Sequence, residues 1–172
     1  MQLHFRTPAE LEPSVFDSIL RLIRHAGEVN PATVRERLEA TPLIGYITVE
    51  GNVVATASVK KPLDTDVDNA FVKAHSPYRY GDFPFELGYL VVASSFRRRG
   101  FASLLTKGRC ERFVEHNLFS TVRCENVSVG KILRAHGFFP TGKPFRNRTD
   151  TEDLVLFIKL AATTVQPRPR IT

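Results

Sequence analysis

Residues 85–105 read FELGYLVVASSFRRRGFASLL, and this stretch decides the fold. Its first part, 85–93, is mostly apolar, which is typical of a buried strand. Its last part predicts a helix over 100–116, with an apolar side formed by Phe101, Leu104, Leu105 and Phe113. A strand that leads through a short basic loop into a helix is a candidate anion site, because the first backbone N–H groups of a helix have no partner within it.

The loop itself is suited to a phosphate group. Gly100 lets the backbone approach an anion without a Cβ in the way, and Ala102 is the next smallest choice. Arg97, Arg98 and Arg99 add positive charge, and we expect one or two of them to face the ligand. The alternative interpretation is an ordinary strand-to-helix turn with a solvated basic run. These residues alone do not decide between the two.

Towards the C-terminus, strands and helices alternate. A strand is predicted over 119–124 and a helix over 127–136, which Gly137 ends as a helix C-cap. Two more strands follow at 138–141 and 153–160. This alternation predicts an α/β or α+β protein with a partly parallel sheet and helices on its faces.

The N-terminal part supplies the remaining elements. The pattern predicts a strand over 2–6 and then a helix that opens at Pro13, with Val15, Phe16, Ile19, Leu20 and Ile23 on one face. Asn30 and Pro31 resemble an N-cap and a first helical residue, so a second helix is predicted over 31–40. A hairpin follows, with strands over 43–49 and 53–60 around Glu50-Gly51-Asn52. Residues 61–84 carry no clear period, apart from a short helix suggested around 66–74.

The size and composition of the chain limit its function classes. Its 172 residues fit a single domain, predicted over 1–165 and followed by a flexible basic tail, 166–172. The net charge of +6 favours anionic ligands. Nucleic acid is the less favoured partner, because no basic stripe is interleaved with aromatic residues. With no apolar run long enough to span a bilayer and no secretory signal, we expect a cytoplasmic protein without a membrane partner. Two cysteines without metal-ligand spacing predict neither a disulfide framework nor a metal.

Four motifs follow one another in order between residues 43 and 160. Arg97 to Ala102 match Arg/Gln-x-x-Gly-x-Gly/Ala, and Glu86 to Val92 match Glu-Leu-x-x-Leu-x-Val. Asn126 stands 11 and 12 residues before Gly137-Phe138, and the hairpin YITVEGNVVATASV comes first. Together they resemble the GNAT superfamily of N-acetyltransferases. The resemblance implies a mixed, mostly antiparallel twisted sheet of about six or seven strands, with a parallel splayed central pair and helices on both faces.

The same resemblance implies acetyl-CoA as the cofactor. Backbone groups of Leu90, Val91 and Val92 would pair with its pantetheine arm, as an added strand does. The pyrophosphate would be held by the backbone amides of Arg97, Arg98, Arg99, Gly100, Phe101 and Ala102. Asn126 would hydrogen-bond the cofactor near the arm. A helix N-cap is the alternative role for Asn126, and one side chain can serve both.

The implied reaction is direct attack of a primary amine on the thioester within a ternary complex. Glu86 is the expected general base and the Val92 N–H the expected oxyanion donor. The family commonly has a tyrosine acid seven residues after the asparagine, but here that position is Leu133. The acid therefore stays unassigned, with Tyr89, Ser128, a loop tyrosine or unassisted departure of the thiolate as alternatives.

The acceptor is not named by any motif. Tyr78 and Tyr80 are the expected substrate contacts, although simple packing of the loop would explain them equally well. We expect a small amine or an amino-acid-like metabolite as substrate. An amino group of a protein or nucleic acid is the alternative, and so is a non-catalytic CoA-binding module. Dimers are common in families of this kind, so a homodimer is a further expectation.

Overall fold

The structure is a computed structural model that describes residues 1–27, 29–62, 70–146 and 152–162. It divides into two compact units, Met1–Lys61 with Leu87–Arg112, and Pro62–Glu86 with Phe113–Thr172. The hydrogen-bonded strand order is β1-β2-β3-β4-β5-β7-β6. The single domain predicted over 1–165 stays a prediction, and the predicted tail 166–172 lies outside the described residues.

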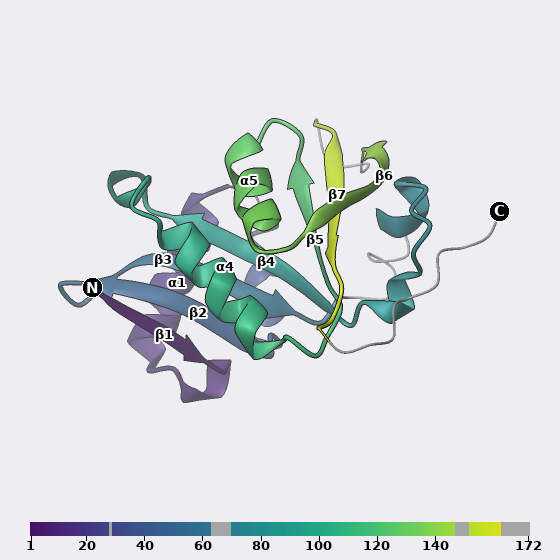
Figure 1. The fold of residues 1–172 in the computed structure, drawn as a ribbon. Coiled ribbons are helices and arrows are strands. Elements are labelled where there is room, and N and C mark those ends of the chain that lie inside the picture. Colours follow the sequence, from purple (N-terminus) through teal and green to yellow (C-terminus); the bar gives the residue numbers. More distant parts are fainter. Residues whose placement is uncertain (28, 63–69, 147–151, 163–172) are drawn as a thin grey trace. The chain divides into compact units, whose positions relative to one another are not determined.

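The first unit contains the N-terminal antiparallel strands of the sheet (Figure 1). Its elements are β1 (Gln2–Arg6), α1 (Pro13–His25), α2 (Val34–Glu39), β2 (Leu43–Val49), β3 (Asn52–Lys60), most of β4 (Phe85–Val92) and α4 (Phe101–Arg112). The turn between β2 and β3 consists of Glu50 and Gly51, which have φ values of 50° and 78°. Two positive φ values in a two-residue turn match the twist of the flanking strands, so the predicted hairpin is confirmed.

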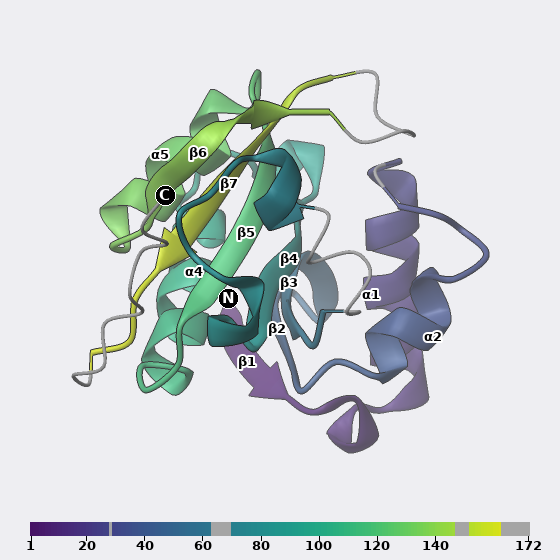
Figure 2. The ribbon, with the colours of Figure 1, turned by 90° about the vertical axis from the view of Figure 1, so that its right-hand side faces the viewer.

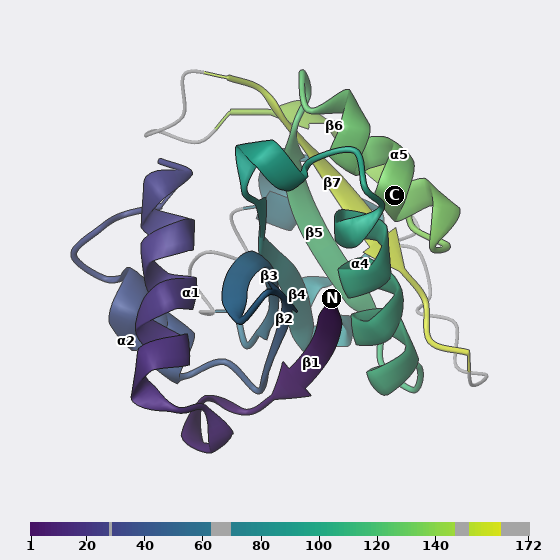
Figure 3. The ribbon, with the colours of Figure 1, turned by 90° about the vertical axis from the view of Figure 1, so that its left-hand side faces the viewer.

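Helices cover both faces of this part of the sheet, as Figures 2 and 3 show for α1 and α2 on one side and α4 on the other. The alternation of side chains along β4 explains the arrangement. Tyr89 and Val91 pack into the cluster formed with α1, whereas Leu90 and Val92 pack into the cluster formed with α4. Strand β4 is therefore apolar on both faces, as its sequence predicts.

Helix α4 approaches β1 and β2 closely, because glycines face each other across Phe5. A Cβ at Gly108 of α4 or at Gly45 of β2 would overlap the ring of Phe5. The Arg112 guanidinium lies over the same ring, 3.9 Å from its centroid. The missing side chains of the two glycines thus make the space that the Phe5 ring occupies.

The second unit contains the parallel pair and the C-terminal strands. Its elements are the start of β4, β5 (Leu118–Arg123), α5 (Val127–Ala135), β6 (Phe139–Phe145) and β7 (Leu154–Lys159). Strand β4 pairs with β5 in parallel at Phe85↔Leu118 and Glu86↔Phe119, whereas β5–β7 and β6–β7 are antiparallel. The predicted mixed, mostly antiparallel sheet is confirmed.

Both faces of the second unit are also covered. One face of β7 contributes Leu154, Leu156 and Ile158 to a cluster with Phe71 and Phe119. On the other face, Phe157 lies against α5, where the Arg134 guanidinium is 5.0 Å from its ring centroid. Residues 70–73 are helical, and the earlier part of the helix suggested around 66–74 lies outside the described residues.

Two helix predictions are corrected. Helix α2 begins at Val34 rather than Pro31, because the Asn30 side chain accepts a hydrogen bond from the Ala32 N–H in a turn that precedes the helix. Helix α4 ends at Arg112, and Leu104 is 36% exposed, so Leu104 and Phe113 are not part of its buried side. Within the described residues, no helix has both the length and the apolar character needed to cross a bilayer.

We predict strong coupling between Gly108 and Phe5. Gly108→Ala should lower the free energy of unfolding by about 1–3 kcal/mol, because the new Cβ displaces the Phe5 ring. In a Phe5→Ala background the same change should be neutral or stabilising, since alanine exceeds glycine in helix propensity by about 1 kcal/mol. Urea unfolding of the four proteins measures the coupling. Gly130→Ala in α5 is the control, because the nearest atom there is the end of the flexible Arg134 side chain. An equal cost of Gly108→Ala in both backgrounds would contradict the close approach.

Candidate functional site

The loop between β4 and α4 presents a run of unpaired peptide N–H groups. A short 3-10 turn covers Ser94–Phe96, and then Arg98 and Gly100 adopt left-handed conformations with φ of 62° and 80°. From Arg98 to Ala102, no backbone N–H has a hydrogen-bond partner among the described residues. Successive N–H groups in such a conformation form an anion-binding concavity at a helix N-terminus. The geometry supports the phosphate interpretation of this loop.

Gly100 leaves this concavity open. A Cβ placed on Gly100 would have no other heavy atom of the protein within 4 Å. An approaching anion therefore meets backbone rather than side chain at this position. The residue also needs to be glycine for conformational reasons, because a φ of 80° disfavours any side chain.

The three arginines differ in what they contact. Arg97 Nε donates to the Val92 carbonyl over 3.3 Å, and Arg99 Nη2 donates to the Ser95 carbonyl over 3.3 Å. The Arg99 guanidinium also lies 4.9 Å from the ring centroid of Phe96. The Arg98 side chain is exposed and has no partner within the described part of the chain. Two arginines thus support the loop while their charge stays exposed beside it.

The predicted β4 residues Leu90, Val91 and Val92 lie in the first unit with this loop. All three are half-buried. The Val92 carbonyl accepts from Arg97, and the next residue, Ala93, donates its N–H to the Val54 carbonyl over 2.9 Å. The end of β4 is therefore fixed to β3 immediately before the loop begins.

Other predicted residues belong to the second unit. Glu86 is half-buried and stands opposite Phe119 of β5 in the parallel pair. Tyr78 and Tyr80 both pack against the apolar cluster of this unit. The Tyr78 ring makes edge contacts with Phe83 and Phe139 at centroid distances of 6.1 and 6.3 Å. The packing role that the sequence left open for the tyrosines is present, and their role as substrate contacts stays a prediction.

Asn126 is the N-cap of α5. Its Oδ1 accepts a hydrogen bond from the Val129 N–H over 3.3 Å. Its Nδ2 has no hydrogen-bond partner among the described residues, and the side chain is half-buried. The capping role uses only the oxygen, so the amide N–H groups remain able to bind a ligand.

Leu133 is 1% exposed and lies inside the second unit. A buried aliphatic side chain has no proton to donate. Among the described residues, no group of three or more His, Cys, Asp or Glu side chains is arranged to hold a metal ion.

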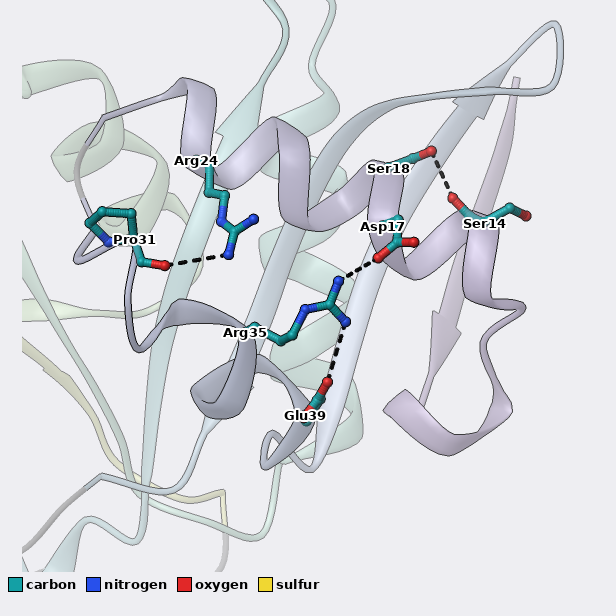
Figure 4. Close-up of polar contacts among 7 residues, drawn as sticks. All are labelled: Ser14, Asp17, Ser18, Arg24, Pro31, Arg35 and Glu39. Carbon is teal, nitrogen blue, oxygen red and sulfur yellow. Dashed lines mark hydrogen bonds and ion pairs between the residues drawn. The ribbon is translucent and has the colours of Figure 1, made fainter.

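Helices α1 and α2 of the first unit are joined by polar contacts (Figure 4). Arg35 donates to Asp17 over 2.6 Å and contacts Glu39 at 3.5 Å, and Arg24 donates to the Pro31 carbonyl over 3.3 Å. The hydrogen bond with Asp17 raises the pKa of Arg35. The Arg35–Asp17 pair thus links α2 to α1, the Arg35–Glu39 pair lies within α2, and the Arg24 bond connects α1 to the segment that precedes α2.

A hollow of about 530 Å³ lies along α1 at the β2–β3 turn. It is lined by Ser14, Val15, Ser18, Arg21, Leu22, His25, Gly51, Asn52 and Val53. None of these residues is acidic, and Arg21 has no ion pair within the described part of the chain. The hollow therefore suits a ligand with an anionic or neutral polar group rather than a cation.

Sequence reasoning missed the buried arginine of α4, Arg109. It is 1% exposed, and it follows Phe101 and Leu105 at intervals of four residues. That spacing, which continues the apolar stripe of the helix, is the signal that could have found it.

Comparison with known proteins identifies the fold. No protein-family model and no curated protein sequence matches the chain. Solved structures do match it. The ribosomal-protein-S18-alanine N-acetyltransferase from Escherichia coli superposes with a TM-score of 0.67 at 17% identity, over 96% of this chain and 97% of that one. The ribosomal-protein-alanine N-acetyltransferase from Brucella melitensis gives 0.65 at 19% identity, over 93% and 99%. A GNAT-family acetyltransferase from Streptococcus pneumoniae gives 0.66 at 15% identity, over 94% and 100%. The chain therefore has the GNAT N-acetyltransferase fold.

Two substitutions at Asn126 test its role as a helix cap. Asn126→Ala should lower the free energy of unfolding by about 1 kcal/mol, because the Val129 N–H loses its acceptor. Asn126→Asp should cost little, since aspartate caps as well as asparagine and favours the helix dipole. Urea unfolding measures both. Equal stability of the alanine variant and the parent would show that the cap contributes nothing.

Proposed function

From the GNAT N-acetyltransferase fold and the open anion loop, we propose that the protein is an acetyl-CoA-dependent N-acetyltransferase. One observation carries the proposal: the backbone N–H groups from Arg98 to Ala102 have no hydrogen-bond partner among the described residues. They lead into the first turn of α4, and the space beside Gly100 among them is open. A pyrophosphate is an anion of the size and charge that such a loop binds.

The cofactor role divides among three groups of residues. The amides of the loop would hold the pyrophosphate, and the exposed Arg98 would add attraction. The backbone of Leu90, Val91 and Val92 would pair with the pantetheine arm as a further strand. The free Nδ2 of Asn126 would donate to the arm. When bound, acetyl-CoA supplies an acetyl group activated as a thioester.

The catalytic role rests on Glu86 and Val92. Glu86 would accept the proton that the attacking primary amine loses as its nitrogen bonds to the acetyl carbon. The Val92 N–H would donate to the carbonyl oxygen, on which negative charge develops. Leu133 is buried and has no proton to give, so the proposal assigns no general acid.

The acceptor that we propose is a small amine or an amino-acid-like metabolite. The hollow along α1 supports the second of these, because its lining includes Arg21 and His25 and no acidic residue. A carboxylate on the acceptor would be complementary to such a lining. Strand β3 links the hollow to the end of β4. Val53 of β3 lines the hollow, and the carbonyl of the next residue, Val54, accepts a hydrogen bond from the Ala93 N–H.

A protein amino group is the second candidate acceptor. Two structures of this fold are ribosomal-protein-alanine N-acetyltransferases, and the net charge of +6 would favour association with ribonucleoprotein. A non-catalytic CoA-binding module is the third candidate, and it is motivated by Leu133. These candidates differ in which acceptor is acetylated, or in the absence of any turnover.

Calorimetric titration with acetyl-CoA tests the cofactor site. The parent should bind with micromolar affinity, and Gly100→Trp should bind at least about tenfold more weakly, because the new side chain fills the space before the loop amides. Gly27→Trp is a matched control, since Gly27 has φ of 76° and equally open surroundings. Both variants should lose similar stability, but only Gly100→Trp should lose binding. A well-folded parent without affinity for acetyl-CoA would overturn the proposal.

Glu86→Gln tests the proton transfer. It should lower kcat by about 10²–10⁴-fold while the Kd for acetyl-CoA stays near that of the parent, because the change removes the base and keeps the shape. The assay measures free thiol released with a panel of amines, amino acids and peptides with N-terminal alanine. The preferred acceptor in this panel decides between the first and second candidates. Binding of the cofactor with no turnover on any acceptor would favour the non-catalytic module.

A further inference from the structure

Arg109 is a buried cation without a counterion among the described residues. Its side chain comes from α4 and is 1% exposed. Burial lowers the pKa of Arg109 to about 10, so the guanidinium is still charged at neutral pH. Removing a cation from water without a carboxylate partner is costly, and an apolar residue would fill the same space more favourably. Packing alone therefore does not explain why an arginine occupies this buried position.

The guanidinium is held by four hydrogen bonds within the first unit. Nε donates to the Leu105 carbonyl over 3.3 Å, and Nη2 donates to Thr106 Oγ1 over 3.2 Å. Nη1 donates to two strands at once, to the Ser58 carbonyl of β3 over 3.0 Å and to the Gly88 carbonyl of β4 over 3.3 Å. The helix-side bonds orient the planar group, and the other two join it to β3 and β4.

The bond to Gly88 lies where β4 is irregular. The next residue, Tyr89, has φ of 49°, a left-handed conformation that a non-glycine residue rarely adopts within a strand. Lys60 of β3 lies across the same place: a Cβ on Gly88 would be 2.5 Å from Lys60 Cε. The Lys60 ammonium is 4.9 Å from the ring centroid of Tyr89. The step at Gly88 and Tyr89 is thus held by contacts with Arg109 and Lys60.

This step precedes the residues that matter for the proposed function. A single left-handed residue changes the direction of the backbone groups that follow it. Those groups belong to Leu90, Val91 and Val92, the segment proposed to pair with the acyl-CoA arm and to donate the oxyanion hydrogen bond. An arginine is suited to the task, because its planar guanidinium donates to two carbonyls through Nη1 in a fixed geometry and stays charged at neutral pH.

We propose that Arg109 is a positioning residue that holds the Gly88 carbonyl and the left-handed step at Tyr89, and so sets the direction in which Leu90–Val92 present their backbone to the acyl-CoA arm. The inference rests on the proposed function. In this role Arg109 contacts neither the cofactor nor the acceptor and acts through the backbone conformation of β4.

Arg109→Gln and Arg109→Lys test the role. Loss of a hydrogen bond from a charged donor corresponds to about a tenfold to hundredfold effect, and we expect Arg109→Gln to raise the Kd and KM for acetyl-CoA by that factor. The KM for the amine should change less than about twofold, since the acceptor does not pair with β4. Arg109→Lys should recover part of the affinity, because an ammonium still donates to both carbonyls. Arg112→Gln is the matched control, an arginine on the same helix that contacts Phe5 and should leave both KM values unchanged.

Backbone amide NMR spectra supply a readout independent of catalysis. Signals of Tyr89 to Val92 should shift in both Arg109 variants and stay in place in Arg112→Gln. If Arg109→Gln does not fold, Arg109→Lys carries the test alone, with the same pattern at smaller amplitude.

The two possible failures are distinguishable. A parent protein that binds no acetyl-CoA overturns the proposed function and the positioning role with it. A parent that binds, with folded Arg109 variants of unchanged affinity and unchanged amide signals in β4, overturns the positioning role alone. Equal increases in both KM values would also overturn it, because they would indicate a general loss of structure.

Discussion

The peptide N–H groups at the join of β4 and α4 are the constraint on which the site depends. Two left-handed residues, Arg98 and Gly100, turn these groups outwards, where no described part of the chain pairs with them. Such a loop keeps its shape only if other contacts fix both ends. Arg97 and Arg99 bond carbonyls within it, and Ala93 ties its start to β3. The donors are thus in place before any anion arrives, which lowers the entropy lost on binding.

The close approach of α4 to the sheet connects this loop to the rest of the first unit. Gly108 has no side chain to hold the helix away from Phe5, and the next residue is Arg109. A helix lying this near lets a guanidinium reach carbonyls on both β3 and β4. The same helix therefore provides the N-terminus at the proposed anion site and the buried charge that bonds to the strand before it. The glycine at position 108 thus allows the approach of the helix that the hydrogen bonds of Arg109 to β3 and β4 require.

Local patterns in the sequence were sufficient for most of the fold. The hairpin and α1 follow from periodicity and turn residues, which act over short distances, whereas the mixed, mostly antiparallel sheet was implied by the family resemblance. The position of β7 between β5 and β6 was not predicted. The predicted beginning of α2 at Pro31 was wrong. An asparagine such as Asn30 can accept a backbone hydrogen bond in a turn as well as at a helix N-terminus, and the sequence pattern does not distinguish the two. For α4 the helical period was right but the buried stripe was not, since Leu104 is exposed and Arg109 is buried.

The candidate site was predictable to the extent that it is local. The residues from Arg97 to Ala102 form one continuous loop, so their spacing in the sequence is their spacing in space. The burial of Arg109 could have been inferred from its helical spacing, but its acceptors could not, because two of them are backbone carbonyls of Ser58 and Gly88, which are distant in sequence. Asn126 shows a third case. Its capping role could be predicted from its position before a helix. That Oδ1 accepts a hydrogen bond while Nδ2 has no partner among the described residues could be learned only from the structure.

For the proposed reaction, the base matters more than the missing acid. An alkyl amine with a pKa of about 10.4 must lose a proton before it attacks, and at pH 7 this costs about 4.6 kcal/mol. A departing thiolate whose conjugate acid has a pKa of about 8.5 gains only about 2 kcal/mol from protonation at the same pH. A leucine at position 133 therefore removes the smaller of the two contributions. The α-amino group at the N-terminus of a peptide or protein, with a pKa of about 7.7–8.0, needs only about 1 kcal/mol for deprotonation. A site with Glu86 as its only proton-transfer group would therefore be best matched to the N-terminal amino group of a peptide or protein, the second candidate acceptor. In a free amino acid the neighbouring carboxylate raises the pKa of the amino group, so that such an acceptor depends more strongly on the base.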